Sequence, residues 1–230
     1  ADVIIAATGV FHQPFLPELE GLGDFAGNLV HTAQWAESVP VAGRRLGIIG
    51  TGSSAVQTVG AVVEEVESLS LFQRTAQWVL PQDNPPYTDE EKAAFRADPD
   101  SQRRLRDEIS ELFADGFANA VVDAESPVLA RIAELCQANL DSVVDKELRE
   151  RLTPDHRVAC KRLVISENFY EAIQHPNARL VTNKIDRIVS DGVLTSDGEV
   201  HQLDVLVLAT GFQVDRFMRP MEIVGPVGTR

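Results

Sequence analysis

The stretch from residue 46 to residue 59 constrains the fold most, because an apolar segment passes through a glycine-containing turn into a helical pattern. Gly50 allows a tight turn out of a strand, and Gly52, which lacks a Cβ, lets a pyrophosphate approach the N–H groups at the helix start. Ala55 is small enough for the third position of a G-x-G-x-x-A pattern. The stretch predicts a strand, a dinucleotide phosphate loop and a helix, although an ordinary strand-to-helix turn remains an alternative. The cofactor-binding candidates in this stretch are Gly50, Thr51, Gly52, Ser53, Ser54 and Gln57.

A second apolar run at residues 69–72 completes a βαβ unit and decides which dinucleotide is favoured. An NAD site would place Asp or Glu roughly 20 residues after the glycines, next to the ribose hydroxyls. Here the chain has Gln73, Arg74 and Thr75 instead. A guanidinium can bind a 2′-phosphate through paired charge-assisted hydrogen bonds, so the sequence favours NADP over NAD. A solvated arginine at a strand end is the alternative for Arg74.

Composition limits the class of protein. The chain has 230 residues, of which 44% are hydrophobic, and this suits one large or two small domains with a packed core. No apolar run approaches the roughly 20 residues that span a bilayer, and no secretory signal is visible, so we expect a cytoplasmic protein without a membrane partner. The net charge of −14 argues against a nucleic-acid partner. Cys136 and Cys160 are not arranged as metal ligands, so we expect no metal site.

The rest of the chain up to residue 173 contains an apolar run, connecting segments and helical patterns. Residues 2–7 form an apolar run that predicts a buried parallel strand, and its partners would have to lie in a missing N-terminal portion. Residues 10–27 predict an extended connector, and residues 28–40 a linker. Residues 85–155 predict an inserted group of helices, with Thr88 beginning a capping box. A basic loop with Lys161 and Arg162 follows, and Ser166 is expected to cap a short helix.

The C-terminal third predicts strands at residues 179–181 and 185–189, hairpin turns at residues 191–192 and 197–198, and a buried strand at residues 202–209. This last strand ends in Ala209, Thr210 and Gly211, and residues 2–9 follow the same plan of Asp, apolar run and Ala-Thr-Gly. Small residues at a strand end allow a cofactor and a crossing chain to lie close together.

These motifs together resemble the Baeyer–Villiger type of flavin-dependent monooxygenase, over nearly the whole chain. Phe25, Gly27, His31 and Trp35 match four positions of that family's fingerprint, F-x-G-x-x-x-H-x-x-x-W-P/D, and Ala36 departs from it at the last position. The tryptophan distinguishes this type from the related N- and S-oxygenating monooxygenases, which usually have tyrosine there. Those enzymes remain the alternative, together with an isolated nucleotide-binding module that has no catalytic activity.

The resemblance implies an α/β, Rossmann-like NADP domain that carries a helical insertion and is itself inserted in an FAD domain. Residues 1–40 would then end an FAD-domain segment and carry the fingerprint. Residues 41–84 and 156–211 would form the NADP-binding domain, residues 85–155 the insertion, and residues 212–230 the return linker. The FAD phosphate loop would precede Ala1, and the chain alone would be inactive.

The resemblance also implies roles for single residues. Gln73, Arg74, Thr75 and Lys161 would hold the 2′-phosphate of NADP(H), and Ala209, Thr210 and Gly211 would mark a domain crossing. Arg162 would be the active-site arginine, whose permanent charge stabilises negative charge beside the flavin. The implied reaction converts a small-molecule ketone into an ester or lactone with NADPH, FAD and dioxygen.

Overall fold

The computed structural model describes residues 3, 5–36, 38–82, 84–118, 122–216, 221–222 and 224. The chain divides into two compact units, and each is described by itself. The first unit combines Ala1–Arg74 with His175–Arg230, and the second is Thr75–Gln174.

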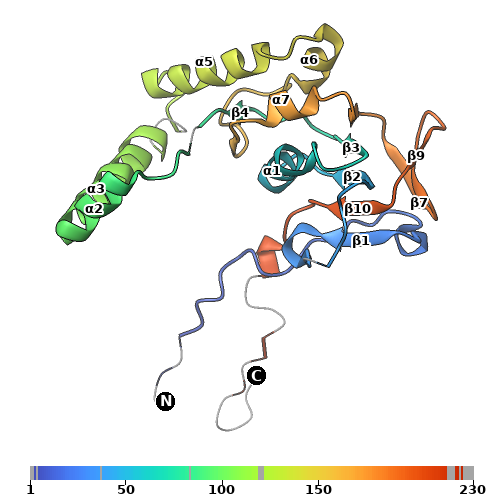
Figure 1. Ribbon diagram of the computed structural model, residues 1–230, viewed down its shortest axis with the longest axis horizontal. Coiled ribbons are helices and arrows are strands. Elements are labelled where there is room, and N and C mark those ends of the chain that lie inside the picture. The colour runs from blue at the N-terminus through green and yellow to red at the C-terminus, as the bar shows by residue number, and fades with distance from the viewer. Residues whose placement is uncertain are drawn as a thin grey trace. The chain divides into compact units, whose positions relative to one another are not determined.

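The first unit is built on a five-stranded parallel sheet (Figure 1). Its strands, in spatial order, are β1 (Asn28–His31), β10 (Val205–Leu208), β2 (Arg45–Ile49), β3 (Ser68–Phe72) and β6 (Ala178–Val181). Strand β10, which lies between β1 and β2, is buried along its whole length. Uninterrupted apolar runs such as residues 205–208 are typical of parallel strands covered on both faces. The Rossmann-like fold predicted from the sequence is confirmed.

The predicted βαβ unit is present, because helix α1 (Ser53–Val62) connects β2 to its parallel neighbour β3. Ala55, Val56 and Val59 form the buried face of this helix. Val59 lies three residues after Val56 and four after Ala55, so the three side chains share one side of the helix. The helix ends at Val62.

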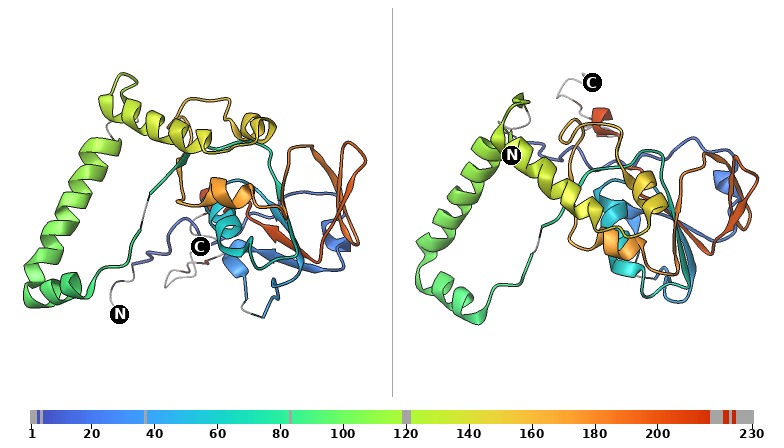
Figure 2. Two further views of the ribbon diagram at one scale, coloured as in Figure 1. Left: turned by 45° about the horizontal axis from the view of Figure 1, so that its top comes forward. Right: turned by 90° about the horizontal axis from the view of Figure 1, so that it is seen from above.

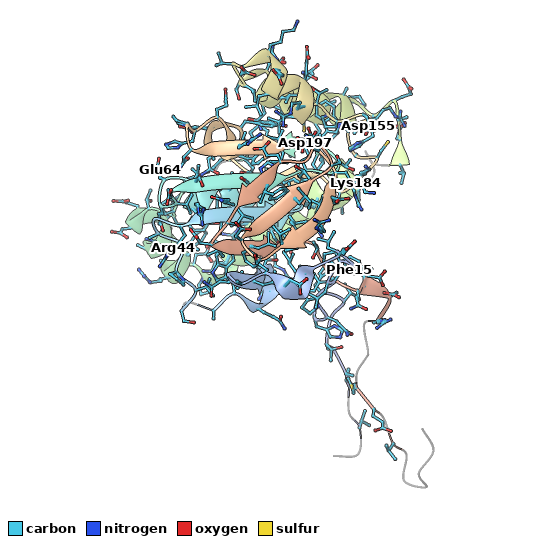
Figure 3. The ribbon with its side chains drawn as sticks, turned by 90° about the vertical axis from the view of Figure 1, so that its right-hand side faces the viewer. Phe15, Arg44, Glu64, Asp155, Lys184 and Asp197 are labelled. Atoms are coloured by element: carbon cyan, nitrogen blue, oxygen red, sulfur yellow. The ribbon has the colours of Figure 1, made fainter. Side chains whose placement is uncertain are left out.

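A small antiparallel sheet belongs to the same unit and consists of β7 (Ile185–Val189), β8 (Gly192–Thr195) and β9 (Val200–Gln202) (Figure 2). Both predicted hairpin turns connect these strands, and Figure 3 marks Lys184 and Asp197 at one end of the sheet. The strand predicted over residues 202–209 is present but starts later: β10 covers Val205–Leu208, and Gln202 ends β9. Between the two strands, Asp204 binds the Arg45 guanidinium through both carboxylate oxygens.

One apolar cluster of the first unit lies where the two sheets meet. Its buried members are Phe72, Val181, Ile188, Val193, Leu203 and Leu206. Buried polar side chains adjoin this cluster. His201 contacts the edge of the Phe72 ring at a centroid distance of 5.3 Å, and its Nε2 lies 3.2 Å from Oγ1 of Thr195.

Two N-terminal predictions are corrected. Residues 28–31 are not a linker but the edge strand β1, which pairs with β10 from Asn28↔Val205 to His31↔Leu208. Short-range pattern could not reveal a partner that lies so far along the chain. Residues 2–7 do not form a buried strand where they are described: Val3 is 76% and Ile5 85% exposed. Asp2 and Ile4 lie outside the described residues. An apolar run is buried only where neighbouring strands cover it, and none pairs with this run in the described part of the chain.

The second unit contains the predicted helices and a two-stranded parallel sheet of β4 (Val79–Leu80) and β5 (Val164–Ile165). The helices are α2 (Asp89–Ala97), α3 (Pro99–Glu111), a π-helical segment (Leu112–Ala118), α5 (Pro127–Asp141), α6 (Lys146–Leu152) and α7 (Phe169–Ile173). The Thr88 capping box is confirmed, with Glu91 as its partner. Ser166 does not cap α7, because Asn168 occupies the N-cap position. In the described part of the chain, no helix is both long and apolar enough to cross a membrane.

Candidate functional site

The turn between β2 and α1 requires glycine at position 50. The backbone of Gly50 has φ +119°, and a Cβ placed there would lie 2.5 Å from the carbonyl oxygen of Ala209. The end of β2 and the residue that follows β10 are held together, because the Ala209 N–H donates to the carbonyl of Ile49 at 2.9 Å. The sequence predicted the tight turn. The neighbour that makes a side chain impossible is visible only in the tertiary structure.

Gly52 occupies the N-cap position of α1, and no side chain caps this helix. A Cβ at Gly52 would meet nothing within 4 Å, so the backbone borders open space at the positive end of the helix dipole. An exposed helix start with a missing Cβ is suited to a phosphate group. Thr51 and Ser53 are half-buried beside this space, and Ser54 and Gln57 are exposed. The residues present therefore fit a dinucleotide pyrophosphate.

The carboxyl end of β3 lies beside the predicted phosphate loop at residues 50–54, because the Gly50 N–H donates to the carbonyl of Phe72 at 3.2 Å. Gln73 is buried, and its N–H donates to the carbonyl of Val181 at 2.8 Å. Arg74 is exposed immediately after it. Thr75, the third residue of the predicted 2′-phosphate group, begins the second unit. Within the first unit, the loop and Arg74 thus follow neighbouring parallel strands at the same sheet edge.

The exit of β10 is held by the segment around Phe15 (Figure 3). The Thr210 hydroxyl donates to the carbonyl of Phe15 at 2.5 Å, and the Phe15 N–H donates to the carbonyl of Gly211 at 2.9 Å. Ala209 lies against Gly50 of the predicted phosphate loop. The three small residues at 209–211 therefore connect the loop with the N-terminal segment.

His31 ends β1 and is 3% exposed. Its Nδ1 accepts a hydrogen bond from the Ala33 N–H at 3.1 Å, so the ring proton resides on Nε2, which donates to the carbonyl of Gly211 at 3.1 Å. Phe212 packs nearly edge-on against the imidazole, with the ring centroids 5.8 Å apart. Burial lowers the pKa of His31 from its ordinary value, which favours the neutral ring. The fingerprint histidine therefore joins β1 to the exit of β10.

The other fingerprint residues shape the two ends of the same strand. Phe25 packs against the core of the first unit, and a Cβ at Gly27 would lie 2.7 Å from its ring and 2.4 Å from the carbonyl oxygen of Asp204. That carbonyl accepts the Asn28 N–H at 2.9 Å, where β1 begins. Trp35 follows the 3₁₀ turn Thr32–Gln34 and is half-buried.

The predicted pair Lys161 and Arg162 lies in the second unit, and both side chains are exposed. The preceding loop is anchored by the Trp78 indole, whose Nε1 donates to the carbonyl of His156 at 2.7 Å. Ala159 has φ +66°, the one positive φ at a non-glycine residue in the described part of the chain. Such a conformation costs an alanine about 1 kcal/mol. No sequence signal pointed to Ala159.

The two cysteines have different environments. Cys136 is fully buried, and burial raises the pKa of its thiol to about 11, whereas Cys160 is exposed next to Lys161. Among the described residues, no three His, Cys, Asp or Glu side chains gather where they could hold a metal ion.

Comparisons with known proteins show what the chain as a whole is similar to. No protein-family model matches the chain. An uncharacterized monooxygenase from Mycobacterium tuberculosis is 43% identical over 231 residues, which is 100% of this chain and 46% of that protein. A Baeyer–Villiger monooxygenase from Streptomyces coelicolor is 33% identical over 232 residues, 99% of this chain and 44% of that protein.

A solved structure shows the same fold. Cyclohexanone monooxygenase from Rhodococcus sp. Phi1, bound to NADP+, matches with a TM-score of 0.81 and 31% identity, over 96% of this chain and 49% of that one. The chain thus spans about half the length of the relatives that it matches. The resemblance predicted from the motifs is confirmed: over nearly its whole length, this chain is similar to about half of a Baeyer–Villiger-type monooxygenase.

Proposed function

We propose that this chain is the NADP(H)-binding portion of a flavin-dependent monooxygenase of the Baeyer–Villiger type. The observation that carries the proposal is the uncapped start of α1, where Gly52 borders open space beside the carboxyl end of β3. A dinucleotide pyrophosphate would receive hydrogen bonds from the backbone N–H groups there. The likeness to a cyclohexanone monooxygenase that binds NADP+ supports the same assignment.

Residues 50–54 would hold the pyrophosphate, with Gln57 on the first turns of the helix. Arg74 would bind the 2′-phosphate, and Gln73, Thr75 and Lys161 would complete its binding site. No Asp or Glu occupies positions 73–75, so nothing there favours an unphosphorylated ribose or repels a 2′-phosphate. In the domain division that we propose, residues 41–84 and 156–211 form this NADP domain, and residues 85–155 are its insertion.

When both cofactors are bound, NADPH would supply hydride to FAD, and the flavin would supply the chemistry that places an oxygen atom from dioxygen beside a ketone carbonyl. The protein would contribute binding and electrostatics. Arg162 would present a permanently charged guanidinium to negative charge near the flavin, a role that a lysine could not fill with the same planar geometry. A ketone substrate is supported by the relatives named Baeyer–Villiger monooxygenase.

The proposal is tested by measuring the affinity of this chain for NADPH and NADH in the wild type and in Arg74→Ala. Losing one charge-assisted contact to the 2′-phosphate should weaken NADPH binding by about tenfold or more and leave NADH binding nearly unchanged. Arg44→Ala is the matched control. Arg44 precedes β2 at the opposite edge of the same sheet, and Figure 3 shows it on the far side of the unit from Phe15. Equal losses for both dinucleotides would contradict the role of Arg74.

The chemical step needs a form of the protein that carries bound flavin. Such a form, offered a cyclic ketone and a thioether in competition, should convert the ketone to a lactone with consumption of NADPH. Sulfoxide as the main product would instead indicate an N- or S-oxygenating monooxygenase.

A further inference from the structure

The loop between Val158 and Leu163 contains Lys161 and Arg162. The proposed function assigns a role to each of these two cationic residues. Val158 and Leu163 are both buried and, with Cys136, form one apolar cluster. Cys160, Lys161 and Arg162 lie between these anchors and are exposed. The chain therefore leaves the cluster after Val158 and returns to it at Leu163, which gives the loop little length in which to reverse direction.

A tight turn makes this reversal. The Cys160 N–H donates to the carbonyl of Arg157 at 3.2 Å, and Ala159 occupies the third of the four turn positions with φ +66°. A positive φ at that position is characteristic of a type II turn, where glycine or asparagine is the usual residue. The chain places an alanine there instead.

The alanine methyl has a packing role that glycine could not fill. Ala159 is half-buried and packs against the cluster of Cys136, Val158 and Leu163, as Ala133 of α5 also does. This contact offsets part of the conformational cost of the left-handed backbone. Non-glycine residues with a positive φ persist only where the surroundings determine them, and they concentrate at functional sites.

We propose that Ala159 is a positioning residue, whose left-handed turn presents Lys161 and Arg162 together to an anionic dinucleotide. The inference rests on the proposed function and adds a determinant to it. A right-handed backbone at Ala159 would change the direction of the chain just before the two cations, while Val158 and Leu163 must stay in the cluster. The pair would then be displaced without losing either charge.

Three substitutions at this position separate backbone conformation from side-chain volume. Val is β-branched and strongly disfavours a positive φ, whereas Asn and Gly adopt it readily. Ala133→Val is the matched control, because it adds the same two methyl groups against the same cluster from a right-handed helix. Ala159→Val should therefore disturb the loop, while Ala159→Asn, Ala159→Gly and Ala133→Val should preserve it.

The first readout does not depend on cofactor binding. Cys160 is exposed and adjacent to the turn, whereas Cys136 is fully buried, so the reaction of the native chain with Ellman's reagent reports on Cys160. We expect Ala159→Val to change its rate by about threefold or more, since thiolate reactivity depends on exposure and on neighbouring cations. The other three variants should react at nearly the wild-type rate. A wild-type rate in Ala159→Val would overturn the inference.

The second readout is the affinity for NADPH and NADH. Ala159→Val should approach the loss of NADPH affinity in Lys161→Ala, about tenfold, as expected for one lost charge-assisted contact. Ala159→Asn should retain the wild-type affinity. If Lys161→Ala weakens NADPH binding and Ala159→Val does not, or if Ala133→Val weakens it equally, the inference is wrong while the proposed function stands. If Lys161→Ala leaves NADPH affinity unchanged, the proposed role of Lys161 is wrong, and so is the proposed positioning role of Ala159.

Discussion

Nε2 of His31 donates a hydrogen bond to the carbonyl oxygen of Gly211 at 3.1 Å, across 180 residues of sequence. The same carbonyl accepts the N–H of Phe15, so three distant segments meet at Gly211. Phe25 and Gly27 shape the start of β1, and His31 ends it. These three fingerprint residues therefore shape the edge strand β1, and His31 attaches its end to the residues that follow β10.

The stability of the chain should fall on mild acidification. Burial lowers the folded-state pKa of His31 from its ordinary value of 6.5, and it lowers that of His201 too. As the pH falls below about 6.5, the unfolded chain takes up protons that the folded chain does not, so unfolding becomes more favourable, by at most ~1.4 kcal/mol per pH unit for each group. The melting temperature measured between pH 8 and about 5 should decrease accordingly.

His31→Gln should remove part of this pH dependence, because glutamine can still donate a hydrogen bond but does not titrate in this range. His201 should supply part of the dependence that remains. An unaltered slope in His31→Gln would refute the role of His31 in acid sensitivity.

Gly50→Ala should destabilise the first unit by about 2 kcal/mol or more, because the new methyl meets the backbone of Ala209 and the φ of +119° is disfavoured for alanine. Gly43→Ala is the comparison. Its φ is +66°, but a Cβ there meets nothing within 4 Å, so only the conformational cost of ~1 kcal/mol applies. Urea unfolding at equilibrium measures both. Equal losses would show that the close approach of Ala209 is not limiting.

Gly52→Ala should separate binding from folding. A methyl at position 52 enters open space and meets no atom of the protein, so the free energy of unfolding should change by no more than about 1 kcal/mol. The same methyl would occupy the space that we assign to the pyrophosphate, and NADPH affinity should fall by about tenfold or more. Gly23→Ala, also free of nearby atoms, should change neither quantity. Full NADPH affinity in Gly52→Ala would place the dinucleotide elsewhere.

Arg162→Ala should abolish ester or lactone formation in a flavin-containing form of the protein, while reduction of the flavin by NADPH persists. The reason is that the guanidinium would act on charge that develops after hydride transfer. Rapid-mixing absorbance of the flavin and product chromatography measure the two steps. Arg157→Ala, which removes an exposed arginine just before Val158, should leave both intact. Normal product formation by Arg162→Ala would exclude it from catalysis.

Local patterns in the sequence were sufficient for the elements whose causes are local. The glycines at 50 and 52, the spacing of Ala55, Val56 and Val59, and the Thr88 capping box each act within a few residues, so the βαβ unit and the helix start were predictable. The resemblance to Baeyer–Villiger-type monooxygenases could also be predicted from the sequence, because the fingerprint consists of residue types at fixed spacing. The roles of Arg74, Lys161 and Arg162 stay predictions.

The tertiary structure decided what depends on partners far along the chain. Residues 28–31 become a strand only because β10 supplies its backbone groups, and the apolar residues near the N-terminus stay exposed because no strand of the described chain covers them. The same reason explains why position 50 must be glycine, since the atom that excludes a side chain belongs to Ala209. Sequence determined which local turns and helices could form, and long-range packing decided which segments they meet, because hydrogen-bond pairing and steric exclusion act between neighbours in space.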